Sequence, residues 1–136
     1  MLLLKKVKVI KKEIVKPSRE DIIELSKNDD KIKFILNEAQ KKFGRLLRAN
    51  ETSTLVWLYV DEGLSPAVIL MAIDYAKTID KLSIGYIQKV CIDWLNSGVD
   101  NILAAEERIK ILNQRRTAWY MISSVFGLIK RSPSKK

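Results

Sequence analysis

Residues 63–76 carry the sequence GLSPAVILMAIDYA, which predicts a helix with an unusual surface. Ser65 is a typical N-cap, and Pro66 suits the first helical position because no helical hydrogen bond needs its missing N–H. From Pro66 to about Ala76, apolar side chains point to nearly every side of this helix. A helix of this kind belongs in the middle of a bundle, where other helices cover its faces.

Capping residues followed by apolar stripes predict three helices before this one. Ser18, with Asp21 three residues later, begins a short helix. Residues 28–30 cap a second helix, which ends near Gly44, and Asn50 is expected to cap a third. Their apolar stripes are Ile22, Ile23 and Leu25; Ile32, Ile35, Leu36, Ala39 and Phe43; and Leu55, Leu58 and Tyr59.

Two further helices are predicted after residue 80. Ser83 caps a helix that runs to about Asn96, and Asp100 opens another whose stripe is Ile102, Ala105, Ile109 and Leu112. Residues 115–129 are either its continuation or a separate helix. No internal repeat and no strand pattern is evident. The sequence therefore predicts an all-α protein, a compact bundle of five to six short helices with a basic C-terminal helix and tail.

The composition argues against catalysis. The chain of 136 residues has no histidine and one cysteine, so the usual general base and a structural zinc site are both missing. Its five glycines stand singly, so there is no phosphate-binding loop. Cys91 lies on an apolar helix stripe and is interpreted as a core residue, and the paired carboxylates are interpreted as caps or solvated charges. We therefore expect no enzyme, no cofactor and no metal.

The apolar runs are too short to cross a membrane, and the N-terminal Met1-Leu2-Leu3-Leu4 leads straight into lysines. We expect no signal peptide, no membrane anchor and no membrane partner. Together with the single cysteine, this favours a cytoplasmic location.

The net charge of +9 is concentrated at the two ends of the chain. Residues 1–19 have seven basic residues and one acidic residue, and residues 109–136 have seven basic residues and none that are acidic. Residues 20–108 are mildly acidic, with fifteen acidic and eleven basic residues. We therefore divide the chain into a basic linker or arm (1–17), a helical domain (18–112) and a basic C-terminal helix and tail (113–136). Only the arms can neutralise phosphates.

One predicted helix carries a spaced motif. Tyr86, Val90 and Trp94 are four residues apart, so they form a ridge beside the stripe of Ile84, Ile87 and Cys91. Two interpretations remain open. The rings are either core residues whose polar ends reach the surface, or stacking surfaces for nucleic-acid bases. Lys89, on the exposed side of the same helix, is a lesser candidate contact.

The segments GLSPAVILMAI (63–73) and YIQKVCIDW (86–94), followed by Gly98-Val99, resemble the DnaD-like domain of primosome proteins and phage replisome organisers. The family's Tyr-x-x-x-Ile-x-x-x-Trp motif is met here with valine in the middle place. The resemblance extends from about Asp30 to Ile129. It implies a non-enzymatic helical domain that binds single- and double-stranded DNA in replication initiation and restart. It also implies contacts with the initiator DnaA and helicase-loading proteins.

One departure from the family concerns the N-terminus. Complete members usually carry a winged-helix domain that drives oligomerisation, and residues 1–19 are too short to form one. The chain therefore resembles an excised domain or a reduced member, and homo-oligomerisation remains possible but open. The lysines of residues 5–16 alternate with apolar residues and are interpreted as a linker.

The C-terminal arm combines basic and aromatic residues, as backbone tracking and base stacking require. Arg108 and Arg115 are seven residues apart on one helix face, close enough to meet successive phosphates. The other expected contacts are Lys110, Arg116, Trp119, Tyr120, Lys130, Arg131, Lys135 and Lys136. Alternatively, Trp119, Ile122 and Phe126 fold back onto the bundle and the basic residues are only solvated.

The alternative function is that of a protein–protein adaptor of the primosome without direct DNA binding. In that case the acidic body docks an initiator or helicase loader. An exposed apolar patch around Tyr59, Leu64 and Val99 would favour it.

Overall fold

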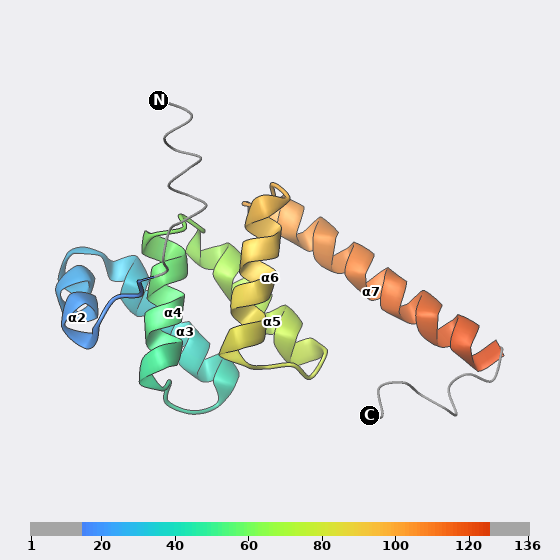
Figure 1. Cartoon of the computed structure of the whole chain (residues 1–136), viewed down its shortest axis with the longest axis horizontal. Coiled ribbons are helices and arrows are strands. Elements are labelled where there is room, and N and C mark those ends of the chain that lie inside the picture. Colours follow the sequence, from blue (N-terminus) through green and yellow to red (C-terminus); the bar gives the residue numbers. More distant parts are fainter. Residues whose placement is uncertain (1–14, 126–136) are drawn as a thin grey trace. The chain divides into compact units, whose positions relative to one another are not determined.

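The computed structural model describes residues 15–125, with side chains through Ile122, and its described part is entirely helical (Figure 1). The helices are α2 (Arg19–Asn28), α3 (Asp30–Phe43), α4 (Ala49–Val60), α5 (Pro66–Thr78), α6 (Ile84–Asn96) and α7 (Ile102–Val125). No strand occurs within residues 15–125, which confirms the predicted all-α class. The chain divides into two compact units, residues 1–63 and 64–136, here called the N-terminal and C-terminal units.

In the N-terminal unit, α2, α3 and α4 pack against one another. A core cluster joins Ile22, Ile32 and Val56, one residue from each helix. The partly buried side chains that pack against this cluster are Leu25, Leu36 and Tyr59. Each helix therefore contributes an apolar face to a common core. Two details differ from the predicted stripes: Val56 of α4, which lies outside its stripe, is a core residue, and Ile23 of the α2 stripe is 52% exposed.

The caps at the start of the first two helices are as predicted. The Asp21 N–H donates to Ser18 Oγ at 3.2 Å, and the Ser18 N–H donates to Asp21 Oδ2 at 3.1 Å. This reciprocal pair satisfies two N–H groups that the helix itself leaves without partners. At the start of α3, Asp29 Oδ1 accepts from the Lys31 N–H at 2.9 Å. Gly44 ends α3 with φ +76°, a conformation that side chains with a Cβ rarely adopt.

Two expected caps are wrong by one or two residues. The N-cap of α4 is Arg48, not Asn50, because the carboxylate of Glu51 accepts from the Arg48 N–H at 2.7 Å. At α7, Ala104 N–H donates to Asn101 Oδ1 at 2.9 Å, so Asn101 rather than Asp100 supplies the capping side chain. Asp100 and Asn101 have similar capping propensity, so their sequence does not decide between them. At α4 the N-cap Arg48 makes no side-chain cap hydrogen bond, and the Glu51 carboxylate supplies the interaction instead.

In the C-terminal unit, α5 packs against both α6 and α7. Val68, Ile69, Ala72, Ile73 and Ala76 are fully buried, as expected for a helix with apolar residues on most sides. The N-cap is Ser65, whose hydroxyl accepts from the Val68 N–H at 3.3 Å, and Pro66 occupies the first turn. The prediction that this helix occupies a central position therefore holds within its unit.

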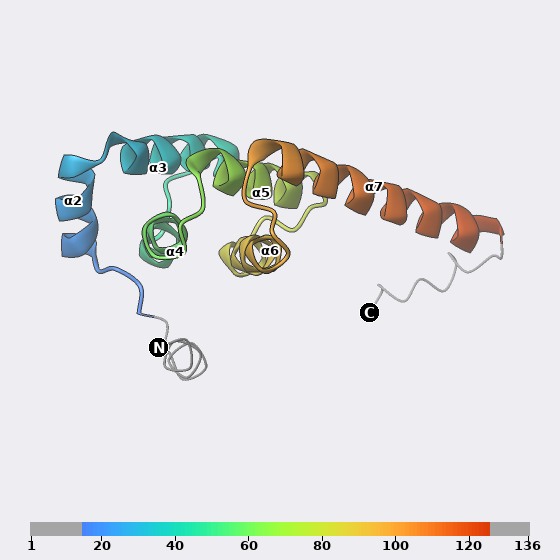
Figure 2. The ribbon, with the colours of Figure 1, turned by 90° about the horizontal axis from the view of Figure 1, so that it is seen from above.

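α7 is one uninterrupted helix of 24 residues. It passes through residue 112, where we expected the helical domain to end, and the segment after Asn113 continues the same helix. Figures 1 and 2 both show its C-terminal half extending beyond α5 and α6. This half therefore has much of its surface free of the other helices of its unit.

Candidate nucleic-acid interface

The three motif residues of α6 differ sharply in exposure. Trp94 is 2% exposed and Val90 is 7% exposed, and both lie in the core with Ile87 and Cys91. Their side chains cannot stack on bases in this conformation, so the core interpretation applies to them. Tyr86 is only partly buried, one turn after the cap where its N–H donates to Ser83 Oγ at 3.2 Å.

Tyr86 has neighbouring groups from α5, from α7 and from the loop that precedes α6. The Lys81 ammonium lies 5.6 Å from the centroid of its ring. Burial, followed by the neighbouring Tyr75 of α5, raises the pKa of the Tyr86 phenol, whereas the positive charge of Arg116 on α7 acts in the opposite direction. The structure thus brings together two of the predicted site residues, Tyr86 and Arg116, that are thirty positions apart in sequence.

Arg116 occupies an unusual place on α7. At about 100° per residue it continues the stripe of Ala105, Ile109 and Leu112, which are buried or partly buried, whereas Ile102, the first residue of the predicted stripe, is 49% exposed. Its Nη1 atom is buried and has no hydrogen-bond partner among the described residues. Because a buried donor without a partner is costly, this guanidinium is suited to an anionic oxygen brought by a ligand.

Arg108, Arg115 and Trp119 share a second face of α7, within about 40° of one another around the helix axis. Arg115 is exposed, Arg108 is partly buried, and Trp119 is 47% exposed. Tyr120, on the side of Arg116, is 62% exposed. In the described structure, the alternative in which Trp119 and Ile122 fold back onto the bundle does not apply, because both side chains are about half exposed.

The remaining predicted contacts are scattered. Lys110 on α7 and Lys89 on α6 are exposed. Lys130, Arg131, Lys135 and Lys136 lie outside the described residues, as does Phe126. Sequence reasoning missed Tyr75, which comes near Tyr86 only because α5 packs beside α6. It also missed Lys81, which lies in the loop before α6, five residues ahead of Tyr86, and whose position over the ring is set by the path of that loop.

The described residues contain no cluster of three or more metal-binding side chains. Burial raises the pKa of the Cys91 thiol to about 12, which is typical of an inert core cysteine. Leu64 and Val99 are 1% and 5% exposed and Tyr59 is partly buried, so they form no exposed apolar patch to support the adaptor interpretation.

A family model described as replication initiation and membrane attachment (DnaB_2) matches residues 36–109, more than half of the chain. The chain belongs to this family. The match confirms the resemblance to DnaD-like replication-initiation domains, and it includes the whole α6 motif. No curated protein and no solved structure gave a match.

The extent of the family match and the family's description both bear on the interpretation of this chain. The matched range ends at residue 109, so the exposed end of α7 lies beyond it and is interpreted from its own geometry. The family description also includes membrane attachment, which the sequence did not predict. Within residues 15–125, no helix is long and apolar enough to span a bilayer.

Proposed function

We propose that this chain is a non-enzymatic DNA-binding module of replication initiation and that α7, from Arg108 onward, is its DNA-binding surface. The observation that carries the proposal is the exposure of Trp119 and Tyr120 on one continuous helix beside Arg115. Residues 108–125 contain no acidic residue, so nothing on this segment repels a phosphate.

The basic residues of this surface supply affinity without sequence preference. Arg108 and Arg115 are about 10.5 Å apart along the helix axis and can contact different phosphates of one strand. Arg116, whose Nη1 has no hydrogen-bond partner among the described residues and whose charge acts on Tyr86, provides a further site for a phosphate oxygen. Lys81, whose ammonium lies 5.6 Å from the centroid of the Tyr86 ring, adds positive charge near this residue.

The aromatic residues supply stacking. Trp119 and Tyr120 present about half of their surface or more, and base–aromatic stacking contributes about 1–3 kcal/mol per base. Stacking requires bases that are accessible, so this surface favours single strands or duplex ends. In the same proposal, DnaA and helicase-loading proteins remain the protein partners.

The experiment is a fluorescence-anisotropy titration of labelled single- and double-stranded oligonucleotides with the full chain, from about 50 to about 200 mM salt. The test variant is the double substitution Trp119→Ala/Tyr120→Ala. The matched control is Leu103→Ala, which removes another exposed apolar side chain from the same helix. We expect the double variant to lose at least about tenfold in affinity for single strands and the control to bind as the parent does.

Two results would overturn the proposal. One is the absence of binding to either oligonucleotide at low salt, and the other is an affinity that does not change with salt. Equal affinity of the double variant and the parent would remove the stacking role while leaving phosphate binding in place.

The adaptor function remains the second candidate because Met121 and Ile122, 64% and 51% exposed, extend the apolar surface of α7. An exposed apolar helix face is typical of a protein-docking site. In that case the chain would fail to bind oligonucleotides, and the same double variant would lose a protein partner instead.

A further inference from the structure

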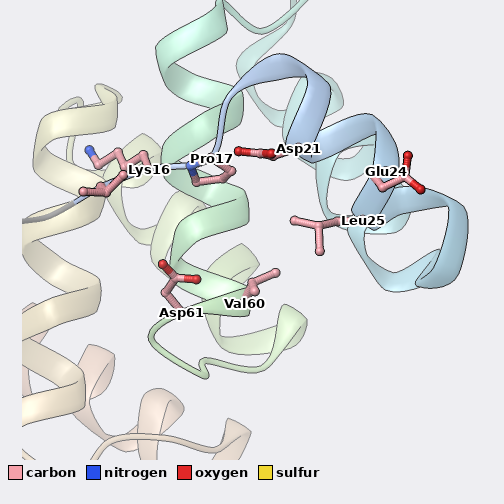
Figure 3. Close-up of a pocket in the computed structure, with 8 residues that line it drawn as sticks. Lys16, Pro17, Asp21, Glu24, Leu25, Val60 and Asp61 are labelled. Carbon is pink, nitrogen blue, oxygen red and sulfur yellow. The ribbon is translucent and has the colours of Figure 1, made fainter.

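A second candidate site lies in the N-terminal unit, in the pocket between α2 and the end of α4 (Figure 3). Its volume is about 420 Å³, within the range of ligand-binding clefts. Figure 3 shows Leu25 of α2 and Val60 of α4 reaching into the space between the two helices. Pro17 completes this apolar lining.

The residues that line the pocket are exposed or partly exposed to solvent, and contacts with the rest of the unit fix two of them, Pro17 and Leu25. Val60 is 42% exposed and Val15 is 71% exposed, whereas Leu25 packs against the core cluster of its unit. The segment before α2 is attached to α4 because the Ser53 hydroxyl donates to the Pro17 carbonyl at 2.5 Å. The pocket therefore presents apolar surface that the described part of the chain leaves uncovered.

The charge around the pocket is opposite to that of the chain as a whole. Among the described residues that line it, there are three carboxylates, those of Asp21, Glu24 and Asp61, and one ammonium, that of Lys16. Lys16 Nζ donates to Thr54 Oγ1 at 3.0 Å and lies 5.5 Å from the centroid of the Trp57 ring. In a protein of net charge +9, a cluster with this excess of acid attracts cations and repels DNA.

The three carboxylates are not equally available. Asp21 accepts the Ser18 N–H, and Glu24 lies 3.7 Å from the Lys27 ammonium in an exposed pair. The carboxylate of Asp61 has no ion-pair partner among residues 15–122, and Figure 3 shows it beside Val60 at the edge of the pocket. Within the described part of the chain, an unpaired carboxylate next to an exposed aliphatic surface is thus the distinguishing feature of this site.

We propose that the pocket binds a segment of a partner protein in which a lysine or arginine adjoins an aliphatic side chain. The aliphatic side chain enters between Leu25 and Val60, and the cation of its neighbour pairs with Asp61. The apolar contact provides affinity, and the charge provides specificity and excludes nucleic acid. This site is separate from the DNA-binding surface proposed on α7 and does not depend on it.

The test uses a fluorescein-labelled synthetic peptide of alternating lysine and valine, titrated with the full chain and followed by anisotropy. Two comparison peptides carry glutamate in place of lysine, or serine in place of valine. We expect only the lysine–valine peptide to bind. Binding of the lysine–serine peptide with equal affinity would overturn the proposal, because it would show unspecific attraction to negative charge.

The variant Asp61→Lys reverses the free charge at a helix C-terminus, where lysine is well tolerated. The matched control is Glu107→Lys, the same charge reversal at an exposed position on α7. We expect Asp61→Lys to weaken peptide binding by at least about tenfold and Glu107→Lys to leave it nearly unchanged. An equal effect of both variants would overturn the proposal. Circular-dichroism melting of each variant verifies that it is folded.

The variant Val60→Asn tests the apolar part without changing charge, and it too is expected to weaken peptide binding. Oligonucleotide binding by Val60→Asn is expected to equal that of the parent, while Trp119→Ala/Tyr120→Ala retains peptide binding. If the peptide does not bind the full chain, only the pocket proposal is overturned. The DNA-binding proposal is tested by a separate titration with oligonucleotides.

Discussion

Arg45 donates through both terminal nitrogens to the carboxylate of Glu51, with Nη1–Oε1 at 2.8 Å and Nη2–Oε2 at 2.7 Å. Glu51 is 3% exposed and also accepts from the Arg48 N–H, so one buried carboxylate connects the loop after α3 to the first turn of α4. The hydrogen bonds from Arg45 lower the pKa of Glu51 to about 2, although burial opposes this.

This ion pair predicts a loss of stability in acid. Because the pKa of Glu51 is about 2 in the folded chain and about 4.5 ordinarily, the stabilisation is complete above about pH 4.5 and disappears as the pH falls towards 2. Glu51→Gln should lower the free energy of unfolding at pH 7 by about 2 kcal/mol, and by much less at pH 2. Urea denaturation at both pH values measures this. Glu24→Gln, in an exposed pair, serves as the control and should have little effect.

The contact between Tyr59 and Asp29 predicts a measurable change in pKa. The Tyr59 hydroxyl donates to Asp29 Oδ2 at 2.6 Å, and this hydrogen bond is the main cause of the lowered pKa of Asp29. Tyr59→Phe removes the donor and should raise the pKa of the Asp29 carboxyl. An NMR titration of the carboxyl carbon measures it. An unchanged pKa in the variant would show that the hydrogen bond is absent in solution.

Replacement by alanine should lower the stability of the chain strongly at Trp94 of α6 and only slightly at Trp119 of α7. Trp94 is 2% exposed, so Trp94→Ala leaves a cavity and should cost about 3–5 kcal/mol of stability. Trp119 is half exposed, so Trp119→Ala should change stability by less than about 1 kcal/mol and act on DNA affinity instead. Thermal denaturation compares the two. A large loss of stability in the Trp119 variant would place that ring in a packed interface.

The salt dependence of DNA binding should show whether Arg115 contacts a phosphate. If Arg115 contacts a phosphate, Arg115→Ala should reduce the slope of log affinity against log salt by about 0.7 for single strands or about 0.9 for duplexes. Lys33→Ala removes an exposed basic side chain of α3 and is the charge-matched control. Identical slopes for the two variants would exclude a specific phosphate contact by Arg115.

The thiol of Cys91 should be unreactive in the folded chain. It is fully buried, and burial raises its pKa to about 12, so almost no thiolate forms at neutral pH. Labelling by a thiol reagent should therefore occur only through unfolding. The labelling rate should rise with urea in parallel with the unfolded fraction. Fast labelling under native conditions would contradict the buried position of this residue.

The sequence by itself determined the helical class and most helix boundaries, because these depend on local chemistry. The capping box of Ser18 and Asp21, the Ser65-Pro66 start of α5 and the end of α3 at Gly44 are all interactions within a few residues. Local chemistry is insufficient at the starts of α4 and α7. Asp100 and Asn101 are equally suited to capping, and α4 begins at Arg48 because the Glu51 carboxylate accepts from the Arg48 N–H, so that Asn50 is not the cap.

The tertiary structure decided which side chains are available for contact. The spacing of Tyr86, Val90 and Trp94 places them on one ridge, yet packing against α5 buries Val90 and Trp94 and leaves only Tyr86 partly accessible. Arg116 reaches Tyr86 only because α7 packs on the same helix, α5. Likewise, the acidic pocket joins Leu25 to Val60, which are far apart in sequence. Such neighbours depend on how helices pack, and helical periodicity contains no information about partners distant in sequence.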